Sequence, residues 1–334
     1  MKRLALIVVT YCLLSLQNTH SSPNLYSATN KDVVKIISGS RTGSYIQLAD
    51  DMKRELPKHS PKGTDVRVVP MIGLGSWQNL IDIQHLNGVD IGLVQHDVLQ
   101  AYAKVDPNIE KKVRYIAKLH DEEIHILANK SIKTLSELTG KKIGIGGNES
   151  GTAMTARNIL NLAGIKAELL NIGSTEALNK LRKGDISAFF YVSGKPVHLF
   201  SEVNPSEPFH FLSITNAKIK AKYKPVKLSK SDYPKLISGM DVETVSVQAI
   251  LAVFNFKKGG VRYKNITSFT EALFSSNKEL KDKSNGYHKK WGTINLCEPV
   301  TGWKVHSSVS NIHKKYCPNS ITTCPQKNPN EMSK

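Results

Sequence analysis

The sequence predicts an α/β fold in which helices cover both faces of mostly parallel sheets. From Val33 onward, short apolar strand segments alternate with segments whose apolar residues recur at helical spacing. Glycine-rich loops follow several of these strands, where parallel sheets bind their ligands. The 334 residues, of which 40% are hydrophobic, are enough for about two domains with a real core.

The elements fall into two blocks. In the first block, a strand precedes the loop 38–44, and Tyr45, Leu48, Ala49 and Met52 then recur at helical spacing. Ser76 is a fair N-cap for a second helix. The second block starts near Ile132. We expect strands over residues 33–37, 66–72, 89–95, 113–119, 123–128, 141–146, 167–172, 186–192, 209–214 and 244–254.

The most informative segment is residues 143–155, Ile-Gly-Ile-Gly-Gly-Asn-Glu-Ser-Gly-Thr-Ala-Met-Thr. An apolar strand runs into a glycine-rich turn that opens directly into a helix. Unpaired backbone N–H groups at such a helix start, flanked by the hydroxyls of Ser150 and Thr152, favour an anion. We therefore predict that Ser150, Gly151 and Thr152 bind a carboxylate, with ordinary helix capping as the alternative.

Three catalytic or nucleotide motifs share this shape, and the segment departs from each. Glu149 replaces the third glycine of a dinucleotide fingerprint, and its charge would oppose a pyrophosphate. Thr152 stands where a phosphate-binding loop needs lysine. Ser150 lacks the G-x-S-x-G frame of a nucleophile elbow, which disfavours a hydrolase. We therefore predict a binding protein and no enzyme.

Two other strand ends supply candidate ligand-binding residues. The loop before the first helix offers Gly43 for close approach, Ser44 as a hydroxyl and Tyr45 as a wall. Gln95 and Asp97 follow another strand and could accept a donor such as a ligand ammonium, although structural capping is an equal alternative. A cleft between two domains would bring these loops to face residues 150–152. By contrast, His125 lies inside an apolar run and is interpreted as a core histidine.

The chain begins with features of a cleavable signal peptide, expected over residues 1–22. Lys2 and Arg3 precede an apolar run, 4–16, that is too short to span a bilayer as a stable helix. We therefore expect an exported, periplasmic protein. Residues 318–334 are rich in Pro, Asn, Ser and Thr and are expected to form a mobile tail.

The formal net charge is +18, of which Lys2 and Arg3 would leave with the leader. Nucleic acid is nevertheless not expected as a partner, because the chain is exported and its lysines are scattered rather than interleaved with aromatic residues. The densest basic run, 218–230, is interpreted as a solvated loop, with a docking surface for an acidic partner or anionic lipid as the alternative.

Three cysteines remain after removal of the leader. Cys317 and Cys324 could close a small loop in an oxidising compartment, and Cys297 could replace either one. A metal site would need more ligands at suitable spacing, so we expect neither a metal nor another cofactor.

The ordered set of motifs resembles the TAXI family, the extracytoplasmic receptors of tripartite ATP-independent periplasmic (TRAP) transporters. The similarity covers about residues 33–316. The motifs are Ser-Gly-Ser-Arg-Thr-Gly-Ser-Tyr at 38–45, Gly-Ser-Trp-Gln-Asn at 75–79, Val-Gln-His-Asp at 94–97, Glu-Ile-His-Ile-Leu at 123–127, Leu-Thr-Gly-Lys-Lys-Ile-Gly-Ile-Gly at 138–146, Ser-Gly-Thr-Ala at 150–153 and Gly-Lys-Pro at 194–196.

The resemblance implies a type II periplasmic-binding-protein fold with two α/β lobes joined by crossover strands. It places lobe 1 at residues 32–126 plus 243–317 and lobe 2 at 127–242. It implies a monomer that binds a small acidic solute such as glutamate between the lobes and then docks on a TRAP membrane permease, and it adds Thr155 to the cleft residues. The rival hypothesis is an exported antigen or sensor partner on the same fold without a transport role.

Overall fold

The computed structural model describes residues 31–41 and 43–318. The expected signal peptide and Cys324 lie outside these residues, as does the expected tail beyond residue 318. The strands are β1 (Val33–Ile37), β2 (Arg67–Met71), β3 (Ile91–Gln95), β4 (Val113–Asn129), β5 (Lys142–Gly144), β6 (Glu168–Leu170), β7 (Ala188–Ser193), β8 (Phe209–Phe211), β9 (Lys224–Leu228) and β10 (Val242–Phe254).

Helices separate most of these strands along the chain. They are α3 (Ser44–Glu55), α4 (Ser76–His85), α5 (His96–Val105), α6 (Ile109–Lys112), α7 (Gly151–Ala163), α8 (Ser174–Lys183), α9 (His198–Ser201), α10 (Ala217–Lys222), α11 (Val261–Ser275), α12 (Asn277–Lys281) and α13 (Val309–Tyr316). None of the helices within the described ranges combines the length and the apolar character needed to cross a bilayer.

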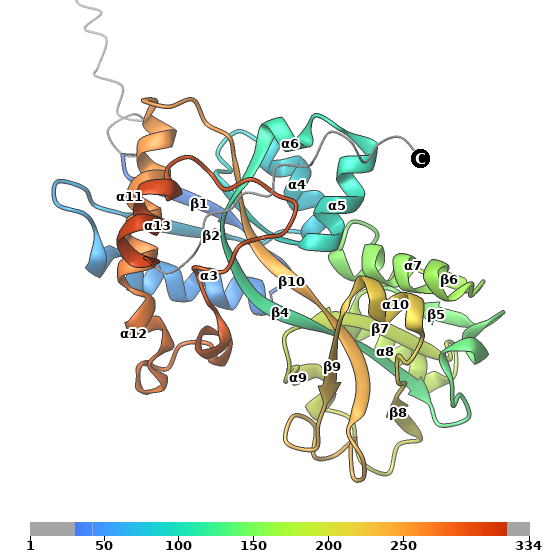
Figure 1. The fold of residues 1–334 in the computed structure, drawn as a ribbon. Coiled ribbons are helices and arrows are strands. Elements are labelled where there is room, and N and C mark those ends of the chain that lie inside the picture. The colour runs from blue at the N-terminus through green and yellow to red at the C-terminus, as the bar shows by residue number, and fades with distance from the viewer. Residues whose placement is uncertain (1–30, 42, 319–334) are drawn as a thin grey trace, which may run out of the picture. The chain divides into compact units, whose positions relative to one another are not determined.

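The strands form one sheet in the order β2-β1-β3-β10-β4-β7-β5-β6, with β8 on β4 and β9 on β10. Strands β1, β2 and β3 pair in parallel, and so do β5, β6 and β7. The long strands β4 and β10 lie antiparallel to each other between the two groups (Figure 1). The predicted α/β fold, in which crossover strands join two groups of parallel strands, is thus confirmed. Its sheet is mixed, because the two crossover strands pair antiparallel with their neighbours.

The buried apolar residues divide along the crossover strands. The β4 residues Ile116, Ala117 and Leu119 pack with α3, β1 and α11, whereas Ile124 and Ile126 pack with β5, α7 and β7. Polar residues of β4 lie between these two sets, so the apolar cores meet at a polar band. The expected lobe boundaries at 126/127 and 242/243 stay a prediction.

Helix α7 forms as its local sequence predicts. The Ser150 side chain accepts a hydrogen bond from the backbone N–H of Ala153, which satisfies one donor of the first turn. The helix ends at Gly164, whose φ of 71° is the left-handed conformation that glycine adopts without a Cβ clash.

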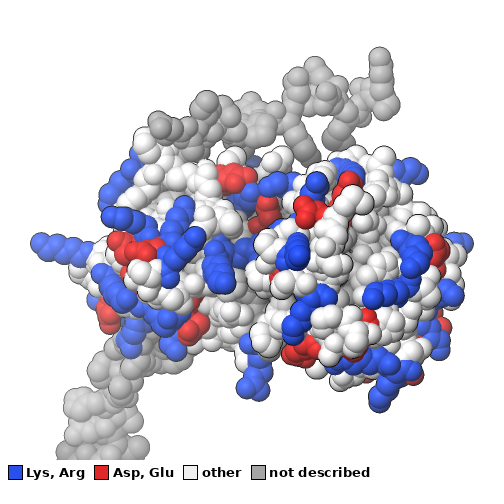
Figure 2. Space-filling model, turned by 90° about the horizontal axis from the view of Figure 1, so that it is seen from below, with Lys and Arg blue, Asp and Glu red and all other residues white. Residues whose placement is uncertain are grey.

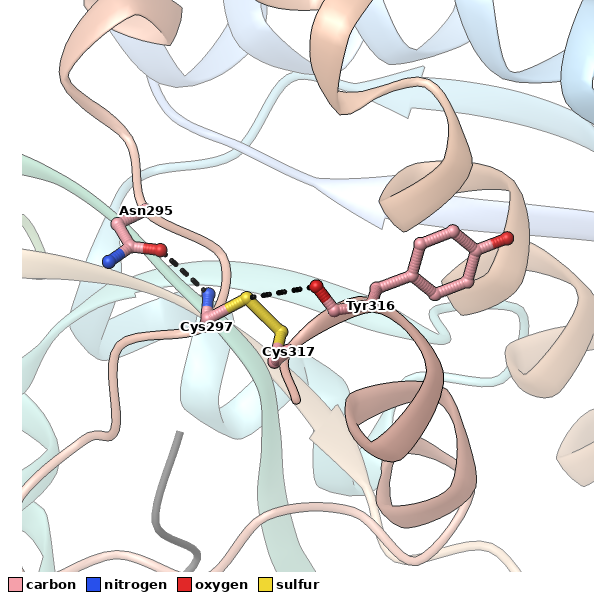
Figure 3. The surroundings of a disulfide bond; sticks show 4 residues. All are labelled: Asn295, Cys297, Tyr316 and Cys317. Atoms are coloured by element: carbon pink, nitrogen blue, oxygen red, sulfur yellow. Dashed lines mark hydrogen bonds between the residues drawn. A yellow bond between two sulfur atoms is a disulfide. The ribbon is translucent and has the colours of Figure 1, made fainter. Parts of the chain in front are cut away.

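Of the cysteine pairings that the sequence leaves open, the structure has Cys297 in place of Cys324 as the partner of Cys317. Cys317 forms a disulfide with Cys297, 20 residues earlier in the chain (Figure 3). The reason is tertiary: the end of α13 lies against the segment around Cys297, and the two Cα atoms are 5.6 Å apart. The backbone of that segment is held by a hydrogen bond from the Cys297 N–H to Asn295.

The basic run 218–230 is not the loop that its composition suggests. Its residues form α10 and the edge strand β9, which pairs with β10 alone. Lys220 pairs with Glu243 and Lys224 with Asp121. Lys and Arg side chains are spread over the face in Figure 2 among fewer acidic ones, as the sequence predicts.

Candidate functional site

Most of the predicted ligand-binding residues meet at one junction, formed by the N-terminus of α7 and the segments that follow β1, β2 and β3. Gly43 precedes α3, and a Cβ there would meet only atoms of Ser40. The backbone N–H of Gln78 in α4 donates a hydrogen bond to the carbonyl of Glu149, just before α7. A Cβ on Gly75 would lie 3.0 Å from the Cα of Ser150, so the two backbones touch. The glycine at position 75 also has a φ of 118°, which few other residues adopt.

The first residue of α7 contacts the end of β3. A Cβ on Gly151 would lie 2.0 Å from Gln95 Oε1 and 2.8 Å from Ser76 Oγ. Ser76 Oγ in turn accepts a hydrogen bond from the Gln95 backbone N–H at 3.1 Å. Glycine at 151 is therefore required by packing, because any side chain would displace a buried polar group.

Asp97 joins three elements. Its Oδ2 accepts hydrogen bonds from Thr155 Oγ1 of α7 at 2.7 Å and from the Tyr223 hydroxyl at 2.9 Å. The carboxyl is buried, and burial raises its pKa despite these two donors. Asp97 thus connects α5 with α7 and with the segment that follows α10, and its Oδ1 is unpartnered within the described residues.

The start of α3 contacts the centre of β4. The Tyr45 hydroxyl donates to Glu122 Oε2 at 2.6 Å, and Ser44 Oγ lies 3.3 Å from His120 Nε2. Burial raises the pKa of Glu122 to about 8. The group is therefore largely a neutral acid at pH 7, which can donate a hydrogen bond and does not repel an anion.

A buried cation lies beside these groups. Lys290 Nζ is 3.1 Å from both carboxylate oxygens of Glu123, and the Lys195 backbone N–H donates to the same carboxylate at 2.7 Å. Burial and the nearby Lys290 hold the pKa of His120 well below its usual value, so the imidazole is neutral.

The hydroxyls of Ser150 and Thr152, in the loop predicted to bind an anion, already have partners. Ser150 Oγ caps α7 and also donates to the Gly147 carbonyl at 2.7 Å. Thr152 Oγ1 accepts from the Val192 N–H at 3.2 Å. Helix capping, the alternative to ligand binding for Ser150, is therefore observed. The binding of a solute here would depend mainly on backbone N–H groups.

His125 is a core residue, as expected. Its Nε2 lies 2.7 Å from the Tyr233 hydroxyl and its Nδ1 lies 3.2 Å from the Tyr191 carbonyl oxygen. Within residues 31–41 and 43–318, no three His, Cys, Asp or Glu side chains are grouped so that they could hold a metal ion.

Sequence reasoning missed four contributors to the junction. Tyr223 and Lys290 come from segments far from any glycine-rich loop, so only the tertiary fold brings them in. His120 and Glu122 carry a signal in the sequence, because polar residues interrupt the apolar run of β4. Buried polar side chains in a central strand need hydrogen-bond partners, so these positions indicate a polar site.

Several solved structures resemble this chain at low sequence identity. A protein from Bordetella bronchiseptica RB50 has a TM-score of 0.53 and 16% sequence identity, over 87% of this chain and 99% of its own. The periplasmic sulfonate-binding protein SsuA of a putative sulfonate ABC transporter from Methylobacillus flagellatus KT has 13% identity, coverage of 76% and 70%, and a TM-score of 0.43. The alkanesulfonate-binding protein SsuA from Xanthomonas axonopodis pv. citri, bound to MOPS, has 12% identity, coverage of 78% of each chain and a TM-score of 0.46.

The fold, with two α/β groups joined by crossover strands, is shared with the Bordetella bronchiseptica protein. A model of the NMT1-like family matches residues 36–301, and the chain belongs to this family. The matched family is named differently from the TAXI family that the motifs resemble.

Proposed function

We propose that the protein is an extracytoplasmic receptor that captures a small acidic solute, a carboxylate or an amino acid such as glutamate, and delivers it to a membrane permease. The observation that carries this proposal is that the N-terminus of α7, with its N–H groups, meets the start of α3 with Tyr45, the end of β3 with Gln95 and the start of α5 with Asp97 at one buried junction. Helix N-termini favour anions.

The electrostatics of the junction support an acidic solute. Glu122 is the acid nearest to Tyr45, and its raised pKa of about 8 leaves it uncharged at neutral pH. Glu123 is neutralised by Lys290 at 3.1 Å. A carboxylate near Gly151 would therefore meet few unpaired negative charges.

We assign the receptor to the TAXI family and its partner to a TRAP-type permease on the ordered motifs, Ser-Gly-Thr-Ala at 150–153 among them. The site is proposed to bind without catalysis. Among the residues that the structure describes, Ser150 Oγ and Thr152 Oγ1 are engaged with backbone groups and neither contacts a general base.

The proposal is tested by calorimetry against dicarboxylates, amino acids and sulfonates, with the mature protein. One class of anion should bind and raise the melting temperature. Because both hydroxyls hold the first turn of α7, whose N–H groups would face the solute, the double variant S150A/T152A should bind that solute about 2- to 30-fold more weakly, equivalent to about 0.5–2 kcal/mol. Asp282→Ala is the control, because it removes a side-chain cap from Ser284 N–H away from the junction. If no solute binds, the receptor function is refuted.

The rival function, an exported antigen or sensor partner, is favoured by one observation. Lys218, Lys222 and Lys227 are exposed on α10 and the edge strand β9. Retention of an acidic protein by the wild type, and its loss in a K218Q/K222Q/K227Q variant, would favour this function if the junction binds no solute.

A further inference from the structure

A groove of about 840 Å³ opens between α3, the segment 286–289 and the turn that follows β7. A volume of this size is typical of sites for small molecules. None of the ligand-binding residues predicted from the sequence lines it. Its charged lining residues are the cations Arg41, Lys53, Arg54, Lys195 and Lys289 and the acids Asp50 and Asp51.

The two acids of the groove are already neutralised from within the protein. Asp51 accepts hydrogen bonds from the His288 N–H at 2.8 Å and from Trp291 Nε1 at 2.9 Å, and it also pairs with Arg54. Asp50 lies 3.3 Å from Arg54 Nε. The acids therefore do not cancel the remaining cations.

Two cations of the groove are left with their charge unpaired. In the part of the chain that the structure describes, Arg41 and Lys289 are exposed and form no ion pair. Lys195 is half-buried and pairs with Asp232 at 2.8 Å. The groove therefore carries an excess of positive charge on a concave surface, which concentrates the field.

Residues that line the groove are close along the chain to residues of the junction. Lys289 immediately precedes the buried Lys290, and Lys195 immediately follows Gly194. A Cβ on Gly194 would lie 2.6 Å from Lys290 Cε and 2.9 Å from His120 Cδ2. On the other wall, Arg41 is three residues before Ser44, whose Oγ contacts the same histidine.

We propose that this groove is the entrance of the solute site, where Arg41 and Lys289 hold an anionic molecule before it reaches the junction. The inference rests on the proposed function and adds to it a first, outer binding step for anions. Because the two cations are solvated, the step is weak and dependent on salt.

Citrate serves as the probe, with binding measured by calorimetry at low ionic strength. R41Q/K289Q should bind citrate roughly fivefold to tenfold more weakly than the wild type. K257Q/K258Q removes the same charge from exposed residues outside the groove and should change the affinity by less than about twofold.

Two results would overturn the entrance: no citrate binding by the wild type, or equal weakening in both charge variants. Either result contradicts a specific outer site. Neither bears on the solute panel that tests the receptor function, so the two proposals fail separately.

Discussion

Replacing Gly151 with alanine tests the contact between α7 and the end of β3. The added Cβ would lie 2.0 Å from Gln95 Oε1 and 2.8 Å from Ser76 Oγ. Gln95 cannot move freely, because it is only 2% exposed and its Oε1 accepts a hydrogen bond from Thr155 at 3.4 Å. Overpacking costs about 1–3 kcal/mol, and an unpartnered buried polar group adds about 1–3 kcal/mol. We therefore expect the free energy of unfolding to fall by about 2–6 kcal/mol.

The assay is urea denaturation followed by circular dichroism, together with small-angle scattering to detect a separation of the two halves. Gly147→Ala is the matched control, because it lies in the same loop and its Cβ would meet nothing within 4 Å. The reasoning is refuted if G151A stays within about 0.5 kcal/mol of G147A and keeps the wild-type radius of gyration.

Four further predictions follow from single contacts. Thr155→Val removes the 2.7 Å hydrogen bond to buried Asp97 and should cost about 1–3 kcal/mol in urea denaturation; an unchanged midpoint would contradict the contact. Burial lowers the pKa of His125 to about 3, so below pH 6.5 the unfolded state takes up a proton that the folded state refuses. Its contribution to the free energy of unfolding should therefore fall by about 1.4 kcal/mol per pH unit between pH 6.5 and 3, and H125Q should lose this slope. The Cys297→Ser variant lacks a disulfide that spans 20 residues, so its free energy of unfolding should fall by about 3 kcal/mol. The wild type should lose the same amount under reducing conditions, and this is the internal check. Burial raises the pKa of Glu122 to about 8, so affinity for an acidic solute should decline above pH 8, and a decline that persists in E122Q would exclude this group as its cause.

The features that the sequence predicted correctly are those set by local rules. Ser150 caps α7 and Gly164 ends it, because cap chemistry and left-handed glycine act within one turn. Strand β1 was predicted with its observed bounds, Val33–Ile37, from a short apolar run followed by a glycine loop. The convergence of Tyr45, Gln95 and residues 150–155 followed from a general rule about strand ends.

Features that depend on tertiary contacts were not predictable in the same way. Strand β4 was expected as two strands, but Val113–Asn129 is one, because pairing with β10 and β7 carries it through its polar residues. Lys290 neutralises Glu123 from 167 positions away. The disulfide partner of Cys317 was left open by spacing and is decided by where α13 packs.

The most direct measurement is a crystal structure of the protein purified under native conditions and saturated with the anion that binds best in calorimetry. The account predicts that the anion lies within hydrogen-bonding distance of the N–H groups of Gly151 and Thr152, with Tyr45 on its other side. A structure in which the saturating anion lies elsewhere, while Gln95 and Thr155 keep the junction filled, would contradict it.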